Sequence, residues 1–268
     1  MTDNELKTAL NRYAQLLVVH GLNVQPGQVV QIASEVCNRE FALLVAEHAY
    51  DAGAKYVLLD FSEPRLMRKR ILNSTEENLG YVPRWLSVRY DDVVNEKGAN
   101  LRLIGSEDPL LLADLDPKRI NTAQLAIRKA IKYFYDEGIG KSKVHWTVAA
   151  ASTAGWGKRL FPGTTSEVAE RKLWESILKV CRADREDCLE AWQKHNMELQ
   201  RRAKLFTEMK IKSLHFSGPG TDLTVSLSQK AVFKGGRDMG PRGVEFEPNI
   251  PTEEVFTTPD RRLCASVL

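Results

Sequence analysis

Apolar side chains at the start of the chain follow the spacing of an amphipathic helix. Leu6, Leu10, Tyr13 and Leu17 recur at steps of three or four residues, which predicts a helix over residues 4–21. These side chains share one face of that helix. The face must therefore pack against a neighbouring layer of the fold.

A strand–helix–strand unit is predicted next. The apolar runs QVVQIA (28–33) and KYVLLDF (55–61) predict strands, and residues 37–52 between them have helical spacing. Ser34 is expected to cap this helix and Gly53 to end it, because helix starts favour hydroxyl side chains and helix ends favour glycine. Such a unit implies parallel strands joined by a right-handed crossover.

Strands and helices continue to alternate as far as residue 209. Two more strands are predicted at NLRLIG (100–105) and KVHWTVAA (143–150). Further helices are predicted over 76–96 with an interruption near Pro83, after Pro117, and over 166–182 and 185–209. This alternation predicts an α/β fold, in which residues 1–208 form an N-terminal domain around a doubly wound, mostly parallel sheet.

The pattern changes after Lys210. Residues 211–216 and 222–227 predict two strands joined by the turn sequence Ser217-Gly218-Pro219-Gly220. A stretch rich in glycine and proline follows over 229–250. We therefore expect residues 209–268 to begin a second, β-rich α+β domain.

Charge and composition exclude several classes of protein. The 268 residues carry 38 basic and 35 acidic side chains spread along the chain, which argues against a dedicated nucleic-acid surface. The first residues lack the basic region of a secretory signal, and no apolar run approaches the ~18 residues that span a bilayer. We expect a soluble, cytoplasmic protein that binds neither nucleic acid nor membranes.

Familiar catalytic motifs are missing from the sequence. It contains no GxGxxG or phosphate-binding loop, no GxSxG elbow, no HExxH and no CxxC pair. The four cysteines are expected to be reduced thiols. A structural role is expected for each of the five separate histidines, which are His20, His48, His145, His195 and His215.

Two adjacent carboxylates, Glu253 and Glu254, precede a short β-forming run. Neighbouring residues of a strand point to opposite faces, so only one of the two can face inward. A carboxylate that faces inward must be paired or must bind a cation. The other interpretation is a solvated turn with two exposed acids, and periodicity alone leaves both open.

Three sequence stretches resemble the M29 family of metalloaminopeptidases. NIPTEEVFTTPD (249–260) is similar to the metal-site segment of that family. HFSGPGTDLTVSL (215–227) is similar to its Gly-Pro-Gly-Thr-Asp-Leu turn, and VHWTVAAASTAGWGKRLFPG (144–163) to its tryptophan-containing strand and following helix. The resemblance follows the order of the whole chain.

This resemblance implies an exopeptidase that removes N-terminal residues from peptides. The family uses two divalent cations, zinc, cobalt or manganese, to activate a bridging water. It implies that Glu254 is a metal ligand and that Glu253 points outward. It also implies a complete enzyme that forms a homodimer, in which the N-terminal domain covers the substrate cavity and the second domain is catalytic.

The same resemblance places the remaining metal ligands and the catalytic tyrosine beyond Leu268. The chain is therefore expected to be truncated at its C-terminus, to supply Glu254 alone and to be inactive by itself. Two alternatives stay open: a ring-cleaving dioxygenase of the same fold with a single iron, and a non-catalytic binding or assembly module. The Thr-Glu-Glu-Val-Phe-Thr sequence favours the peptidase.

Overall fold

The computed structural model describes residues 1–260 and 265–266, which belong to two compact units. The first unit contains Met1–Cys188 and Asp238–Pro251, and the second contains Leu189–Arg237 and Thr252–Leu268. The boundaries of these units therefore differ from the domain boundary predicted at residue 208. The two domains expected from the sequence, 1–208 and 209–268, stay a prediction.

A five-stranded parallel sheet forms the centre of the first unit. Its order is β10-β4-β3-β1-β2, and every neighbouring pair is parallel. The strands are β1 (Val29–Glu35), β2 (Tyr56–Ser62), β3 (Ala99–Ile104), β4 (His145–Ala150) and β10 (Asn249–Ile250). The parallel sheet predicted from the alternating pattern is confirmed.

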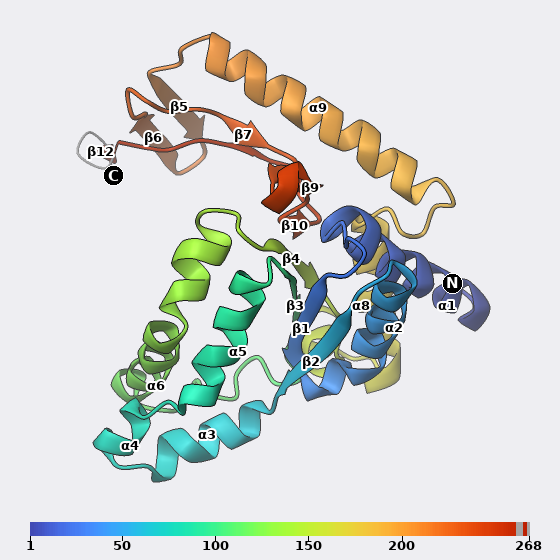
Figure 1. Ribbon diagram of the computed structural model, residues 1–268, viewed down its shortest axis with the longest axis vertical. Helices are drawn as coiled ribbons and strands as arrows, with labels where there is room; N and C mark the ends of the chain where they lie inside the picture. Colours follow the sequence, from blue (N-terminus) through green and yellow to red (C-terminus); the bar gives the residue numbers. More distant parts are fainter. Residues whose placement is uncertain (261–264, 267–268) are drawn as a thin grey trace. The chain divides into compact units, whose positions relative to one another are not determined.

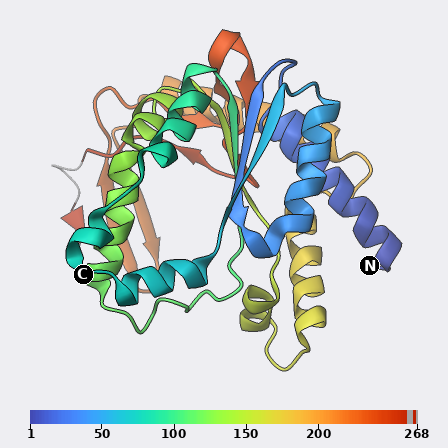
Figure 2. The same cartoon turned by 60° about the horizontal axis from the view of Figure 1, so that its bottom comes forward.

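Helices cover both faces of this sheet (Figures 1 and 2). One side carries α1 (Asp3–Leu16), α2 (Arg39–Asp51) and α8 (Ser166–Val180), and the other carries α5 (Arg84–Asn95) with α6 (Pro117–Ala130) beside it. The central strands β1 and β3 are largely buried between these layers, which explains their apolar runs, whereas the edge strand β2 is half-buried. The doubly wound arrangement is therefore also confirmed.

Shorter elements complete the first unit. They are η1 (Leu17–Gly21), η2 (Val36–Asn38), α3 (Pro64–Asn73), α4 (Glu76–Gly80), η3 (Phe134–Ile139), α7 (Ala154–Leu160), β8 (Asp238–Met239), η4 (Pro241–Gly243) and β9 (Glu245–Phe246). The helix expected over residues 4–21 is α1 continued by the π-helical turn η1.

The predicted helix cap at Ser34 is wrong. Strand β1 continues through Glu35, and the residue that precedes α2 is Asn38. The side-chain amide of Asn38 instead donates a hydrogen bond to the hydroxyl oxygen of Ser34, 3.2 Å away. Ser34 therefore lies in the strand, where extended backbone leaves its hydroxyl unable to reach the first amides of the helix.

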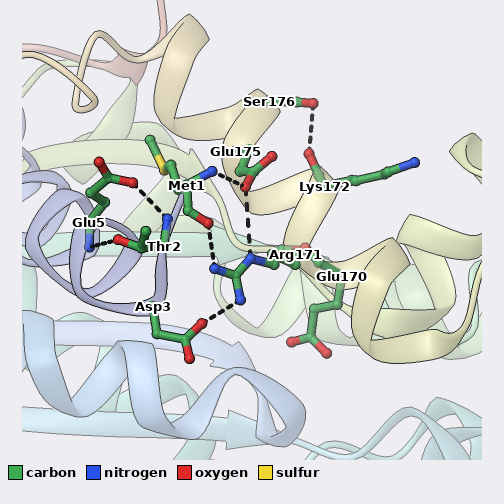
Figure 3. Close-up of polar contacts among 10 residues, drawn as sticks. Met1, Thr2, Asp3, Glu5, Glu170, Arg171, Lys172, Glu175 and Ser176 are labelled. Atoms are coloured by element: carbon green, nitrogen blue, oxygen red, sulfur yellow. Dashed lines mark hydrogen bonds and ion pairs between the residues drawn. The ribbon is translucent and has the colours of Figure 1, made fainter.

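The first residues of the chain are tied to helix α8 (Figure 3). Thr2 caps α1 and exchanges hydrogen bonds with Glu5, the capping-box arrangement. The Met1 ammonium lies 2.9 Å from Glu175, and Arg171 donates to the Met1 carbonyl oxygen at 2.6 Å. Exposed pairs of this kind contribute about 0–1 kcal/mol each, so they orient α1 more than they stabilise the unit.

A late segment of the chain completes the first unit. Residues 238–251 run beside β4, and the main-chain nitrogen of Val148 donates to the Pro248 carbonyl oxygen at 2.9 Å. Phe246 is fully buried and stacks on the His145 ring with centroids 5.4 Å apart. Glu247, also fully buried, places a carboxylate oxygen 3.5 Å from Nε2 of His20.

The second unit is built on one long helix. Helix α9 (Cys188–Glu208) is followed by the antiparallel strands β5 (Ser213–Gly218) and β6 (Thr221–Ser226), joined at a Gly220 with φ of +71°. The remaining strands are β12 (Ala265–Ser266), which pairs with β6, and the antiparallel pair β7 (Lys234–Gly235) and β11 (Val255–Phe256). The strands predicted at 211–216 and 222–227 are confirmed within two residues.

Within the described part of the chain, every helix is too short or too polar to cross a membrane. Cys37, Cys181 and Cys188 are free thiols, as expected. Cys264 lies outside the described residues.

Candidate functional site

The two carboxylates singled out from the sequence lie just before strand β11. Residues 252–254 have no regular structure, and the strand begins only at Val255. Both Glu253 and Glu254 are exposed, with 53% of the Glu253 side chain accessible. The alternation argument was therefore wrong for this pair, because it requires both residues to lie within the strand.

A hydrogen bond folds the end of the Glu254 side chain back onto the main chain. Its Oε2 atom accepts from the backbone nitrogen of Glu253 at 3.0 Å. One carboxylate oxygen is thus engaged locally while the group remains exposed. The assignment of Glu254 as a metal ligand stays a prediction.

His195 on α9 holds the other side of this segment. Its Nε2–H donates to the carbonyl oxygen of Thr252 at 2.8 Å, and the same nitrogen lies 3.2 Å from a carboxylate oxygen of Glu253. The ring of Trp192, fully buried one turn earlier, meets the imidazole edge-on at 5.5 Å. His195 therefore positions the backbone that leads into the two carboxylates.

Helix α9 also fixes strand β7, which pairs with β11. The side-chain oxygen of Asn196 accepts from the backbone nitrogen of Arg237 at 2.8 Å. Gly236 has φ of +74°, and a Cβ there would lie 1.9 Å from that same oxygen. Glycine is required at this position for both reasons. The approach of β7 to α9 in turn places Val255 opposite Gly235.

Sequence reasoning missed the role of His195, although a signal for it was present. Trp192, Asn196, Leu199 and Ala203 are buried at helical spacing along α9, and His195 lies beside this stripe. The stripe predicts which face of the helix is covered. Nothing in it indicates that a segment some 57 positions later in the sequence covers that face.

The described residues do not fit a two-metal site. They contain no group of three His, Cys, Asp or Glu side chains arranged to hold an ion. A catalytic zinc takes three protein ligands in its usual sites, and harder cations take more. His195, Glu253 and Glu254 lie near one another, but His195 is committed to the Thr252 carbonyl.

The other histidines have structural environments, as expected. His20 faces Glu247, the ring of His48 hydrogen-bonds to Asn11, and His215 lies 2.7 Å from the carboxylate of Asp222.

The burial of His145 shifts the pKa of its imidazole. Burial lowers its pKa, and the charge of Arg242 lowers it further. The hydrogen bond from Nδ1–H to the carbonyl oxygen of Leu22, 2.8 Å long, opposes that shift. The neutral imidazole, stacked on Phe246, is therefore the form that the folded unit favours.

Comparison with known proteins identifies the family. A family model described as thermophilic metalloprotease (M29) matches residues 6–265. The chain belongs to the M29 family. Among curated relatives, it is 36% identical to aminopeptidase T of Thermus thermophilus over 98% of this chain and 64% of that protein. It is also 36% identical to aminopeptidase PepS of Streptococcus thermophilus, over 96% of this chain and 62% of that one.

A solved structure agrees with the fold. Wild-type AmpT from Thermus thermophilus superposes with a TM-score of 0.87 at 34% identity, covering 95% of this chain and 62% of that one. The M29 resemblance and the α/β fold class predicted from the sequence are thus confirmed. The comparisons favour the peptidase over the dioxygenase. The chain spans less than two thirds of the length of these relatives.

Proposed function

We propose that this chain is part of a metal-dependent aminopeptidase that releases N-terminal amino acids from peptides. The observation that supports this proposal is the M29 match, which extends over residues 6–265 with curated relatives named aminopeptidases. The proposed substrates are peptides with a free amino terminus. The proposed cofactors are two divalent ions, with zinc, cobalt and manganese as the candidates.

In this proposal Glu254 contributes one carboxylate ligand, and the 268-residue chain by itself is inactive. The lack of any three-donor group among the described residues supports the second point. The described residues have a positioning role, in which His195 and β7 hold the backbone on either side of Glu254. The complete enzyme is proposed to be a cytoplasmic homodimer.

The experiment compares two proteins: this chain, and the same chain extended by a C-terminal region of the length found in its relatives. Aminopeptidase T of Thermus thermophilus is the positive control. Bound metal is measured after dialysis, and turnover of leucine anilide is measured with added cobalt or zinc. We expect metal and turnover in the extended protein and neither in the 268-residue chain.

Two variants of the extended protein test the residue assignment. Glu254→Gln is expected to lower turnover at least about a hundredfold, the usual scale for losing a metal-site carboxylate or its support. Glu253→Gln, the matched control at the next position, is expected to stay within about threefold. Full activity of Glu254→Gln would reject the ligand assignment while leaving the family intact. Metal binding without turnover in the extended protein would instead favour a non-catalytic module.

A further inference from the structure

A pocket opens at the carboxyl edge of the parallel sheet in the first unit. Its volume is about 180 Å³. Three segments line it, each at or soon after the end of a strand: Glu35, Val36 and Cys37 at the end of β1, Glu63, Pro64 and Arg65 after β2, and Glu107, Asp108 and Leu111 after β3. All of these residues belong to the first unit, whereas Glu254 belongs to the second.

The pocket coincides with the point where the sheet reverses its winding. From β1 the chain passes through α2 to β2, and from β2 it passes through α5 to β3 on the other side of β1. Helix α2 lies on one face and α5 on the other (Figures 1 and 2). The connections after β1 and β3 therefore diverge, and open α/β sheets bind ligands in the crevice formed there.

The walls of the pocket are joined to one another. The backbone nitrogen of Glu107 donates to the carboxylate of Glu35 at 3.3 Å, and the side-chain amide of Asn38 donates to the Gly105 carbonyl oxygen at 3.1 Å. On the outer side, a Cβ at Gly155 would lie 1.5 Å from the carbonyl oxygen of Glu107. These close contacts fix the loop after β3, so the pocket is preformed.

Negative charge dominates the lining. It holds four carboxylates and one guanidinium, and Arg65 is paired with Glu63 at 2.8 Å. Glu35, Glu107 and Asp108 form no ion pair with any residue that the structure describes. The lining therefore carries net negative charge in a partly enclosed space, although Arg65 and Arg68 offset part of the charge of Glu107 and Asp108.

Two titrating groups respond to this charge. The pKa of the Cys37 thiol is raised to about 11, first by burial and then by the charges of Glu35 and Glu107. The pKa of Glu170, on helix α8, is also raised, first by burial and then by the charge of Glu107. Both groups thus resist becoming anions. The same potential attracts a cation.

The lining also selects the kind of cation. No three His, Cys, Asp or Glu side chains among the described residues are arranged to hold a metal ion. Val36, Pro64 and Leu111 give the pocket an apolar wall as well as its acidic one. We propose that this pocket binds a small aliphatic primary amine, whose ammonium group faces Glu35 and Glu107 and whose carbon chain packs on Val36 and Leu111.

Calorimetric titration of the 268-residue chain at low salt tests this proposal directly. The probes are pentylamine and 1,5-diaminopentane, with 1-pentanol as the neutral analogue and magnesium chloride as the metal. We expect the amines to bind, the alcohol and magnesium to bind at least about tenfold more weakly, and affinity to fall with added salt. Equal affinity for pentanol or magnesium would overturn the proposal.

Variants assign the binding to the pocket. Glu107→Gln removes one charge and is expected to weaken amine binding about fivefold, the effect of one partly exposed charge pair. Val36→Lys places an ammonium group at the wall and is expected to abolish binding. Glu47→Gln, an exposed carboxylate on α2, is the matched control and should leave affinity unchanged. Unaltered binding in Val36→Lys would overturn the proposal.

A second measurement needs no variant and so does not depend on how variants fold. Cys37 is exposed in the pocket, whereas Cys181 and Cys188 are buried. Two methanethiosulfonate reagents, one with a trimethylammonium group and one with a sulfonate, are compared by the rate at which each modifies the Cys37 peptide. We expect the ratio of the cationic reagent's rate to the anionic reagent's rate to be at least about tenfold higher at Cys37 than at a free thiol. Added diaminopentane should slow the reaction, and a rate ratio like that of the free thiol would refute the inference.

Discussion

Phe246→Ala tests whether the segment 238–251 is an integral part of the first unit. Phe246 is fully buried and contacts the rings of His145 and Trp146, with centroids 5.4 and 6.2 Å away. A buried aromatic side chain removes about 150–250 Å² from water, worth about 4–6 kcal/mol at about 25 cal/mol per Å². Measured Phe→Ala costs of about 3–5 kcal/mol overlap this range. We therefore expect a loss of about 4 kcal/mol.

Urea unfolding followed by circular dichroism measures this loss. For a unit of this size, 1 kcal/mol corresponds to about 2–4 °C, so Tm should fall by about 8–16 °C. The matched control is Phe256→Ala, the same substitution at a side chain that is 57% exposed, which should cost less than about 1 kcal/mol.

Hydrogen exchange locates the effect within the sheet. The amide of Val148, which donates to Pro248, should lose protection in Phe246→Ala and keep it in Phe256→Ala. The reasoning would be refuted if the two variants differed by less than about 1 kcal/mol. It would also be refuted if the Val148 amide exchanged at the same rate in both, because the segment would then not be anchored by Phe246.

Two further predictions concern pH and backbone conformation. Because burial holds the pKa of His145 below its usual 6.5, the unfolded state binds a proton that the folded state does not. Stability should therefore fall as the pH drops below about 6.5. Measured as the change in Tm from pH 7 to pH 5, this loss should be smaller in His145→Gln. It should be unchanged in the control variant His215→Gln. Gly236→Ala should destabilise the second unit by more than Gly220→Ala, because both residues have positive φ but only Gly236 would also clash with Asn196. Equal losses in urea unfolding would contradict the second expectation.

The four long strands of the sheet could be predicted from the sequence because each contains a run of apolar residues, which is largely buried in β1 and β3 and half-buried in the edge strand β2. Strand β10 could not, because it is two residues long and lies in a stretch whose glycines and prolines indicate turns. Helix α3 was given no bounds from the sequence, because four of its ten residues are basic and its start at Pro64 depends on a cap from the preceding Glu63.

The candidate site shows a different limit. Glu254 was singled out by resemblance, and the residues that carry this resemblance form one continuous stretch of sequence around it. The partner that positions this segment is His195, which lies on another element and has no local pattern that links it to Thr252. Periodicity describes which face of an element is covered. It does not say which distant segment covers that face.

The segment that carries Glu254 is held on both sides by distant parts of the chain. Before it, His195 of α9 bonds to the backbone at Thr252. After it, Val255 pairs with Gly235 in strand β7. Each anchor depends on residues that the structure describes, although the chain spans less than two thirds of its relatives' length. The described residues of the second unit therefore set the backbone path of the proposed ligand.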